Sequence, residues 1–306
     1  MTKPLIIYDN DLAGDFDGTV GLAVLLSLDK LNYIQLYGIG LSDNSYWGPI
    51  AVDNAIRYVL KRVIPIGVRS KENPDRSPNH AKASYDRFGA NITWYDCKDV
   101  IKLYRELLTK APDNSVIIIS AGPLINIADL LKSTPDEISE LSGVELVKKK
   151  VSKYIAMAGD FHVTEHREYN VVSDIKSAKY VFANFPKSVP TIVVDFRVPY
   201  KTLTGDVFIE APKDYPIRAQ WEYLGDSKFN RPSWDPYATL LVHPKWNEWF
   251  ILIGPGKVIV DEEGHTFFDK SDDQNQYYIE HRQDITESTL RKIIHEIIKI
   301  NWVEIK

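Results

Sequence analysis

The chain has 306 residues, of which 44% are hydrophobic and 26% charged, and its formal net charge is −5. This composition is that of an ordinary soluble globular protein with a large core, and the acidic balance argues against a general nucleic-acid binder. Cys97 is the only cysteine, so no disulfide can form within the chain. No apolar run approaches the roughly 20 residues of a membrane span, and the first strand is expected to begin by Leu5, which leaves no room for a signal peptide. We therefore expect a cytoplasmic protein that binds neither nucleic acid nor membrane.

Short apolar, β-branched runs alternate with helical patterns along the first two thirds of the chain. The runs lack the polar alternation of a half-exposed sheet, which indicates parallel strands covered on both faces. The alternation predicts an α/β fold with an open, doubly wound, mostly parallel sheet. The expected strands are Leu5–Tyr8, Ile34–Ile39, Ile64–Val68, Val116–Ile119, Tyr154–Met157 and Thr191–Val194, and the expected helices are 18–29, 51–62, 99–110, 124–133 and 173–184.

The remaining third departs from this alternation. Residues 197–233 are rich in Pro, Asp, Tyr and Trp and are expected to form loops with short helices. A small hairpin is expected around residues 261–264, and Asp284 with Glu287 resembles a capping box that opens a final helix. With no linker or repeat in the sequence, residues 1–306 are interpreted as a single domain.

Ligands of such sheets bind beyond the carboxyl ends of the strands. Asp9 and Asp11 stand at the first of these ends, inside the acidic stretch "DNDLAGDFDG" of residues 9–18. An EF-hand is excluded, because Ala13 and Val20 stand at loop positions five and twelve, where an EF-hand needs oxygen ligands. "DFDGTV" matches the signature of haloacid-dehalogenase-type phosphatases, with Asp15 as nucleophile and Asp17 as acid and base, but no apolar run precedes Asp15. The third interpretation is a divalent-cation site completed by ligands from distant loops.

Four segments, in the same order along the chain, resemble the inosine-uridine preferring nucleoside hydrolase family. "DNDLAGDFD" is similar to the long variant of the family's Asp-x-Asp…Asp signature. "SAGPLINIADLL" (120–131), "MAGDF…EYN" (157–170) and "RPSWDPYA" (231–238) resemble its three later motifs. The resemblance covers nearly the whole chain and implies a nucleoside hydrolase fold.

The resemblance also implies roles for individual residues. Asp11 matches the calcium ligand that deprotonates the attacking water, and Asp17 matches a residue that contacts the ribose hydroxyls. Further calcium ligands are implied at Asp235 and at the carbonyl of Ala121. Sugar contacts are implied at Glu168, Asn170 and, in an adjacent register, Asn44. Asp9 is expected to orient neighbouring groups.

Two positions depart from the family pattern. Gly18 stands in place of the second Asp of the pair, a calcium ligand, so we expect Asp15 or Asp17 to fill that place. Trp234 stands where one branch of the family has its leaving-group acid. The histidines His162 and His166 are candidates to protonate the leaving base, and Phe161 and Trp234 are candidates to stack on it.

The sequence thus predicts calcium-dependent hydrolysis of the N-glycosidic bond of ribonucleosides, by water that a metal ion positions and a carboxylate deprotonates. The loops 70–95 and 200–233 are expected to set base preference, and a homodimer or homotetramer is implied. Two alternatives stay open. One is a catalytically impaired family member that binds ribose or nucleosides, which Gly18 favours; the other is the phosphatase.

Overall fold

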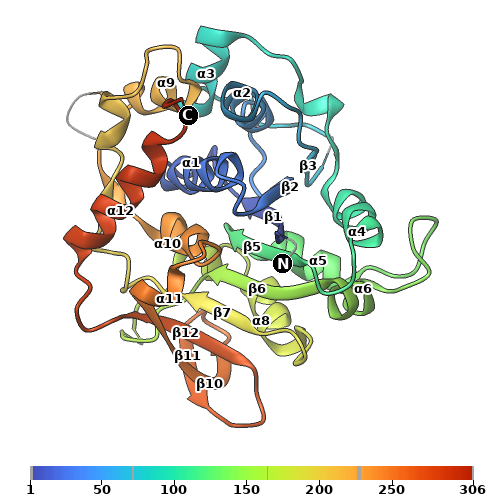
Figure 1. The fold of residues 1–306 in the computed structure, drawn as a ribbon. Coiled ribbons are helices and arrows are strands. Elements are labelled where there is room, and N and C mark those ends of the chain that lie inside the picture. Colours follow the sequence, from blue (N-terminus) through green and yellow to red (C-terminus); the bar gives the residue numbers. More distant parts are fainter. Residues whose placement is uncertain (1–2, 71, 164, 226–228, 305–306) are drawn as a thin grey trace.

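The computed structural model describes residues 3–70, 72–163, 165–225 and 229–304, and all structural statements refer to these residues. Its centre is a ten-stranded sheet in the order β11-β10-β12-β7-β6-β5-β1-β2-β3-β4 (Figure 1). The strands are β1 Leu5–Asn10, β2 Gln35–Leu41, β3 Ile66–Val68, β4 Lys98–Asp99, β5 Val116–Ala121, β6 Val151–Met157, β7 Thr191–Val194, β10 Phe250–Val260, β11 Thr266–Lys270 and β12 Gln276–His281. From β12 to β4 all neighbours pair in parallel, whereas β10 is antiparallel to both of its neighbours. The predicted mostly parallel sheet is confirmed.

Helices cover both faces of the sheet, because the strands are apolar on both sides (Figure 1). Along β5, for example, Ile117 and Ile119 belong to one hydrophobic core and Ile118 to the other. One face carries α1 Asp17–Lys30, α2 Gly48–Leu60, α10 Trp234–Leu240 and α12 Glu287–Lys299; the other carries α4 Val100–Lys110, α5 Ile125–Lys132, α6 Gly143–Lys150 and α8 Ile175–Asn184. All five predicted helices are present within a few residues of their expected bounds.

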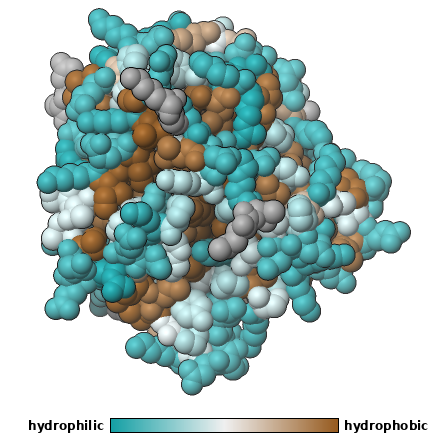
Figure 2. Space-filling view, viewed as in Figure 1, coloured by the Kyte–Doolittle hydropathy of each residue, from teal (hydrophilic) through white to brown (hydrophobic). Residues whose placement is uncertain are grey.

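Shorter elements connect these layers. They are α3 His80–Phe88, α7 Tyr169–Ser173, α9 Pro216–Glu222, α11 Trp246–Trp249, the 3-10 turns Trp94–Asp96 and Asp206–Ile209, and the strand pair β8 Leu203–Thr204 and β9 Arg231–Pro232. The expectation of loops and short helices over 197–233 is thus correct for the described part of that segment. On the face shown in Figure 2, hydrophilic residues dominate, and apolar residues show between them in interrupted patches.

The C-terminal part differs from expectation in two ways. The hairpin β10–β11 is present, but β12 follows it and pairs with β7, so the hairpin extends the main sheet. The final helix is capped by Thr286, whose hydroxyl accepts the N–H of Thr289 at 3.2 Å, and not by Asp284. Asp284 lies two residues too early to reach the free N–H groups of the first turn. Within the described ranges, no helix is long and apolar enough to cross a membrane.

Candidate active site

The carboxyl ends of β1, β5 and β6 border one cavity of about 200 Å³. Most of the residues proposed from the sequence line it, although they come from segments spread over the whole chain. The lining residues are Asp11, Asp15, Asp17, Ala121, Met157, Glu168, Tyr169, Asn170, Phe196, Arg231, Trp234 and Asp235. This convergence is what a parallel sheet produces, because all its strands end at the same edge.

Asp11 is presented to the cavity by a tight turn after β1. Its carbonyl oxygen accepts the N–H groups of Gly14 at 2.6 Å and Asp15 at 3.1 Å. The turn is held from outside by the beginning of α3, since the His80 ring donates from Nε2 to the carbonyl of Leu12 at 2.7 Å. The Asp11 side chain is 6% exposed and has no hydrogen-bonding side-chain partner among the described residues. It is therefore available to a ligand.

Asp17 and Asp235 face each other across the same cavity. Asp17 is the first residue of α1, where the helix dipole favours a negative charge. One of its carboxylate oxygens accepts the backbone N–H of Asp235 at 2.9 Å, which joins the beginnings of α1 and α10. Both side chains are almost fully buried.

The carboxyl groups of these three aspartates have pKa values well above the usual value. Burial is the main cause for Asp11, Asp17 and Asp235 alike, and the nearby carboxylates add to it. Buried, mutually repelling carboxylates favour a bound cation, which restores their ionised form. The donors are all oxygens, from three carboxylates and the carbonyl of Ala121, and this is the set that a hard ion such as Ca²⁺ prefers. The residues fit a calcium ion, apart from the carboxylate missing at Gly18.

Asn10, which the sequence analysis overlooked, lies between two of these candidate ligands. Its Nδ2 donates to Asp235 Oδ2 at 2.7 Å and to the carbonyl oxygen of Ala121 at 3.2 Å, and it lies 2.9 Å from the Tyr8 hydroxyl. Its Oδ1 is buried and has no hydrogen-bond partner in the part of the chain that the structure describes. The only signal in the sequence is its place between Asp9 and Asp11.

Glu168 and Asn170 form a fixed wall of the cavity at the beginning of α7. The Glu168 carboxylate accepts backbone N–H groups from Gly159 at 3.0 Å, Asn170 at 2.8 Å and Val171 at 3.1 Å. Burial nevertheless raises the pKa of Glu168 to about 7. The Asn170 side chain donates to the Met157 carbonyl at 3.1 Å, so both side chains are held before any ligand arrives.

Aromatic rings form the outer wall. The Trp234 ring stacks on Phe196 with a centroid distance of 5.0 Å and an interplanar angle of 27°, and its Nε1 donates to the Phe196 carbonyl at 3.0 Å. Arg231 lines the same region, 3.8 Å from an Asp15 carboxylate oxygen, and Tyr169 is 65% exposed at the rim. Phe196 follows the carboxyl end of β7, so the rule about strand ends would have found it. Arg231 begins the "RPSWDPYA" segment.

His162 lies outside the cavity, contrary to the expectation of a leaving-group acid. Its Nδ1 contacts Asp195 at 2.6 Å and its Nε2 contacts Glu280 at 2.7 Å, so both nitrogens are engaged. The carboxylates, Asp195 first, raise its pKa to about 9. His166 also turns away, to Asp160 at 3.0 Å.

Asp160, His162 and Asp195 are nonetheless close enough together to hold a metal ion. This group is already neutralised by protein groups. Arg197 Nε contacts Asp160 at 2.7 Å, and its backbone N–H donates to Asp195 at 3.1 Å. We therefore interpret it as a structural ion-pair network.

The other corrections concern Phe161 and Asn44. Phe161 packs against Phe268 and Tyr278 of the C-terminal strands, with centroids 5.7 and 5.3 Å away, and does not line the cavity. Asn44 is exposed, and its side chain donates to the carbonyl of Asn73 at 3.3 Å. Asp9 is fully buried and does not line the cavity; Tyr104 and Asn126 donate to its carboxylate, and its role in orienting neighbouring groups stays a prediction.

A second cavity of about 240 Å³ adjoins the first, and Asp11 and Tyr169 line both. Ser42, Asp43 and Arg69 contribute to its wall, so the end of β2 reaches the site through Asp43 instead of Asn44. This cavity continues the site along the edge of the sheet and offers room for a second part of a substrate.

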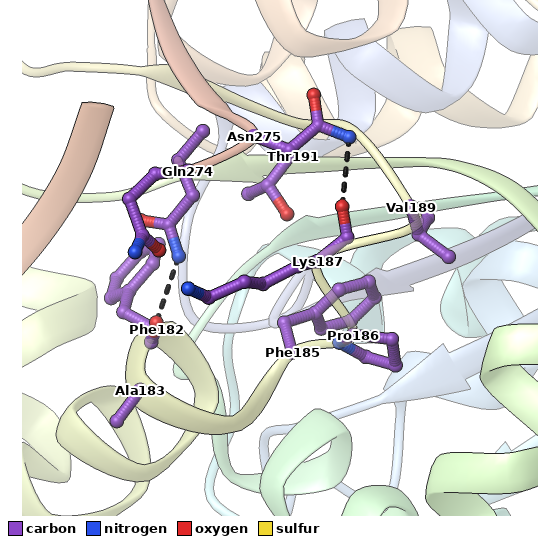
Figure 3. A pocket seen from close by; sticks show the side chains of 10 residues that line it. Phe182, Ala183, Phe185, Pro186, Lys187, Val189, Thr191, Gln274 and Asn275 are labelled. Atoms are coloured by element: carbon purple, nitrogen blue, oxygen red, sulfur yellow. Dashed lines mark hydrogen bonds between the residues drawn. The ribbon is translucent and has the colours of Figure 1, made fainter. Parts of the chain in front are cut away.

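A third hollow, drawn in Figure 3, lies at the opposite edge of the sheet, where β7 and β12 begin. Its volume is only about 20 Å³, and Asn275 Nδ2 closes part of it by donating to the Lys187 carbonyl at 3.0 Å. It has room for little more than a water molecule. We do not regard it as a substrate site.

Comparisons with known proteins agree with this geometry. A family model described as inosine-uridine preferring nucleoside hydrolase matches residues 6–284. The chain belongs to this family. Membership supports hydrolysis of N-glycosidic bonds in general terms, and residues 6–284 include every residue that lines the first cavity.

Several solved structures share the fold at low sequence identity. The inosine-uridine preferring nucleoside hydrolase from Bacillus anthracis is 16% identical, with a TM-score of 0.67 over 97% of this chain and 99% of that one. The purine-preferring ribonucleoside hydrolase from Gardnerella vaginalis is 17% identical, with a TM-score of 0.67 over the same shares. The type III effector protein XopQ, solved with adenosine diphosphate ribose, is 13% identical, with a TM-score of 0.73 over 99% and 95%. No curated protein sequence matches the chain.

Proposed function

We propose that the protein hydrolyses the N-glycosidic bond of ribonucleosides, with calcium as its cofactor, and releases the free base and ribose. One observation carries the proposal. Asp11, Asp17 and Asp235, from segments up to 224 residues apart, line a single cavity together with the carbonyl-bearing Ala121 and with Glu168 and Asn170. Family membership supports the same reaction.

The chemistry assigned to the carboxylates follows from their positions. Asp11, Asp17, Asp235 and the Ala121 carbonyl would hold the ion, which when bound would position water, lower the pKa of that water and hold the ribose hydroxyls. The Asp11 carboxylate, which has no side-chain hydrogen-bond partner among the described residues, takes the proton of the attacking water. The water oxygen bonds to the anomeric carbon, and the carbon–nitrogen bond breaks with its electron pair on the base.

The remaining residues hold the two parts of the substrate. Glu168 and Asn170 line the inner wall, where their fixed side chains meet the sugar. The rings of Trp234 and Phe196 offer an apolar wall against which a base can stack. The leaving base takes its proton from solvent in this scheme, because no histidine lines the cavity among the residues that the structure describes.

The experiment is a screen of purine and pyrimidine ribonucleosides for release of reducing sugar, with wild type and Asp11→Asn. We expect release from at least one nucleoside and a loss of about 10²–10⁴-fold in Asp11→Asn, the usual contribution of a general base. Equal release by both proteins would overturn the assignment of Asp11. The absence of release from any nucleoside would reject the hydrolase.

The second candidate function is a protein that binds ribose or a nucleoside without cleaving it. The specific observation in its favour concerns Asn10, which lies next to Gly18. Its side-chain amide donates hydrogen bonds to two candidate calcium ligands, the Asp235 carboxylate and the Ala121 carbonyl. This candidate predicts nucleoside binding in calorimetry without sugar release. The phosphatase is disfavoured, because Asp15 lies beyond the turn that follows β1, with 33% of its side chain exposed beside Arg231. A cytoplasmic location and a homodimer or homotetramer remain predictions.

A further inference from the structure

Gly18 stands where the family motif has a carboxylate, so the proposed calcium site lacks one ligand. The structure shows which residue lies in the space that this side chain would occupy. A Cβ atom built on Gly18 would stand 2.6 Å from Asn10 Oδ1 and 3.0 Å from Asn10 Nδ2. Cβ atoms essentially never approach another heavy atom within 3.0 Å, so a side chain at position 18 would force the Asn10 carboxamide to move. The carboxamide of Asn10 therefore fills the volume into which any side chain at position 18 would project. In its present position, Asn10 is compatible only with glycine at position 18.

The other end of the same carboxamide already stands among the candidate ligands. Oxygens that surround an ion with six to eight ligands at 2.3–2.6 Å lie roughly 2.8–3.4 Å from one another. Asn10 Nδ2 is 2.7 Å from Asp235 Oδ2 and 3.2 Å from the Ala121 carbonyl oxygen, which is close to this spacing. Half a turn of the amide exchanges its nitrogen and oxygen at nearly the same positions.

We propose that Asn10 and Gly18 are a compensating pair, in which the Asn10 carboxamide replaces the lost carboxylate as a neutral ligand of the cation. Without the ion, Nδ2 donates to Asp235 and Ala121; with the ion, the amide turns and presents Oδ1. Before this turn the fully buried Oδ1 has no hydrogen-bond partner among the described residues; after it, Oδ1 takes the place of Nδ2 between Asp235 and Ala121. The inference deepens the proposed function and rests on its calcium site.

The two aspartates expected to compensate for Gly18 are placed differently. Asp17 already accepts the N–H of Asp235 with one oxygen. Asp15 also lines the cavity: its side chain is one-third exposed, lies 3.8 Å from Arg231 and shares a hydrogen bond with the Asp17 carboxyl group. The atoms nearest to the space beside Gly18 belong to Asn10, whose carboxamide lies 2.6–3.2 Å from where a Cβ atom of residue 18 would stand.

The test is the calcium affinity of the chelator-treated protein, measured by isothermal titration calorimetry with calcium chloride. Asn10→Asp adds a charge at the same place and is expected to tighten binding at least tenfold, because affinity follows the charge of the ligands. Asn10→Ala removes the ligand and is expected to weaken binding at least tenfold. Asn44→Asp is the matched control: it adds the same charge at the end of β2 outside both cavities, and should change the affinity by less than about threefold.

The steric conflict between residues 10 and 18 can be measured separately, by thermal unfolding in the absence of metal and substrate. Gly18→Asp alone is expected to lower the thermal unfolding midpoint by about 5 °C, since its Cβ meets Asn10. The same change in an Asn10→Ala background should cost much less and should restore calcium binding. Unchanged affinity in Asn10→Ala, or equal destabilisation by Gly18→Asp in both backgrounds, would overturn the proposal. Calcium binding as expected, without any nucleoside cleavage, would reject the proposed function and leave the pair standing.

Discussion

The backbone N–H of Asp235 donates to a carboxylate oxygen of Asp17 at 2.9 Å, so two aspartates that are 218 residues apart in the sequence lie side by side at the cavity. The contact ties the first turn of α1 to the first turn of α10. It also sets two buried carboxylates close together, and such an arrangement favours a cation between them. This contact is the basis for the first prediction, which concerns the replacement of Asp235.

Asp235→Asn should separate activity from stability. It removes a candidate calcium ligand, and we expect sugar release to fall at least 100-fold. In the metal-free protein the same change removes a buried carboxyl group whose pKa is raised by burial, so the unfolding midpoint should stay the same or rise. Thermal unfolding in chelator and steady-state kinetics in calcium measure the two effects. A midpoint that falls together with the activity would mean that Asp235 acts mainly as structural support.

Asp15 and Asp11 discriminate between the hydrolase and the phosphatase. Asp15 stands at the partly exposed rim, so we expect Asp15→Asn to reduce nucleoside cleavage by less than about tenfold, far below the effect of Asp11→Asn. The two variants carry the same chemical change four residues apart and control for each other. The phosphatase would show the reverse order, with phosphate release that depends on magnesium and on Asp15.

Trp234 is expected to act in binding. Its ring lines the cavity and stacks on Phe196, so Trp234→Ala should raise KM about tenfold with a smaller effect on kcat. Trp234→Phe keeps an aromatic face and should recover most of the affinity. Initial rates over a range of nucleoside concentrations separate the two constants. A loss confined to kcat would assign the ring a part in the chemical step.

His162 should influence stability at alkaline pH and not catalysis. Its pKa, raised to about 9 by Asp195 and Glu280, lies above the ordinary value of 6.5. A raised histidine pKa means that the ion pairs stabilise the fold fully below about pH 6.5 and that this contribution disappears as the pH passes through about 9. Urea unfolding between pH 6 and 10 should therefore show a decline that His162→Gln flattens. A large loss of sugar release in His162→Gln would instead restore the histidine as the leaving-group acid.

The sequence was sufficient to predict six of the parallel strands, β1, β2, β3, β5, β6 and β7, and to bring most of the candidate residues to one cavity. Buried parallel strands are continuous apolar runs, and ligands bind at their carboxyl ends, so Asp11 and Ala121 could be placed at one edge of the sheet from the sequence, whereas Glu168 came from the resemblance to the family. The motifs of the resembling family linked the distant Asp235 to the same edge. These features depend on local patterns and on topology, which a single sequence carries.

The direction of each side chain could not be predicted. His162 stands beside a motif residue, but Glu280 of the added strand β12 engages its outer nitrogen. Asn44 and Asp43 are neighbours on one loop, and only the turn geometry decides that Asp43 faces the cavity. Asn10 contacts Gly18 because α1 begins close to the end of β1, a distance that no pattern of residues encodes. In each case the direction of the side chain depends on a residue that is distant in the sequence or on the local backbone geometry.

The most direct measurement of the central claim is the calcium dependence of sugar release from the nucleoside that wild type cleaves best. Initial rates are recorded with calcium, after removal of the ion by a chelator, and after calcium is added back. We predict at least a 100-fold fall on removal and full recovery on re-addition, with no recovery in Asp11→Asn. Cleavage that proceeds at the same rate in chelator would contradict the account.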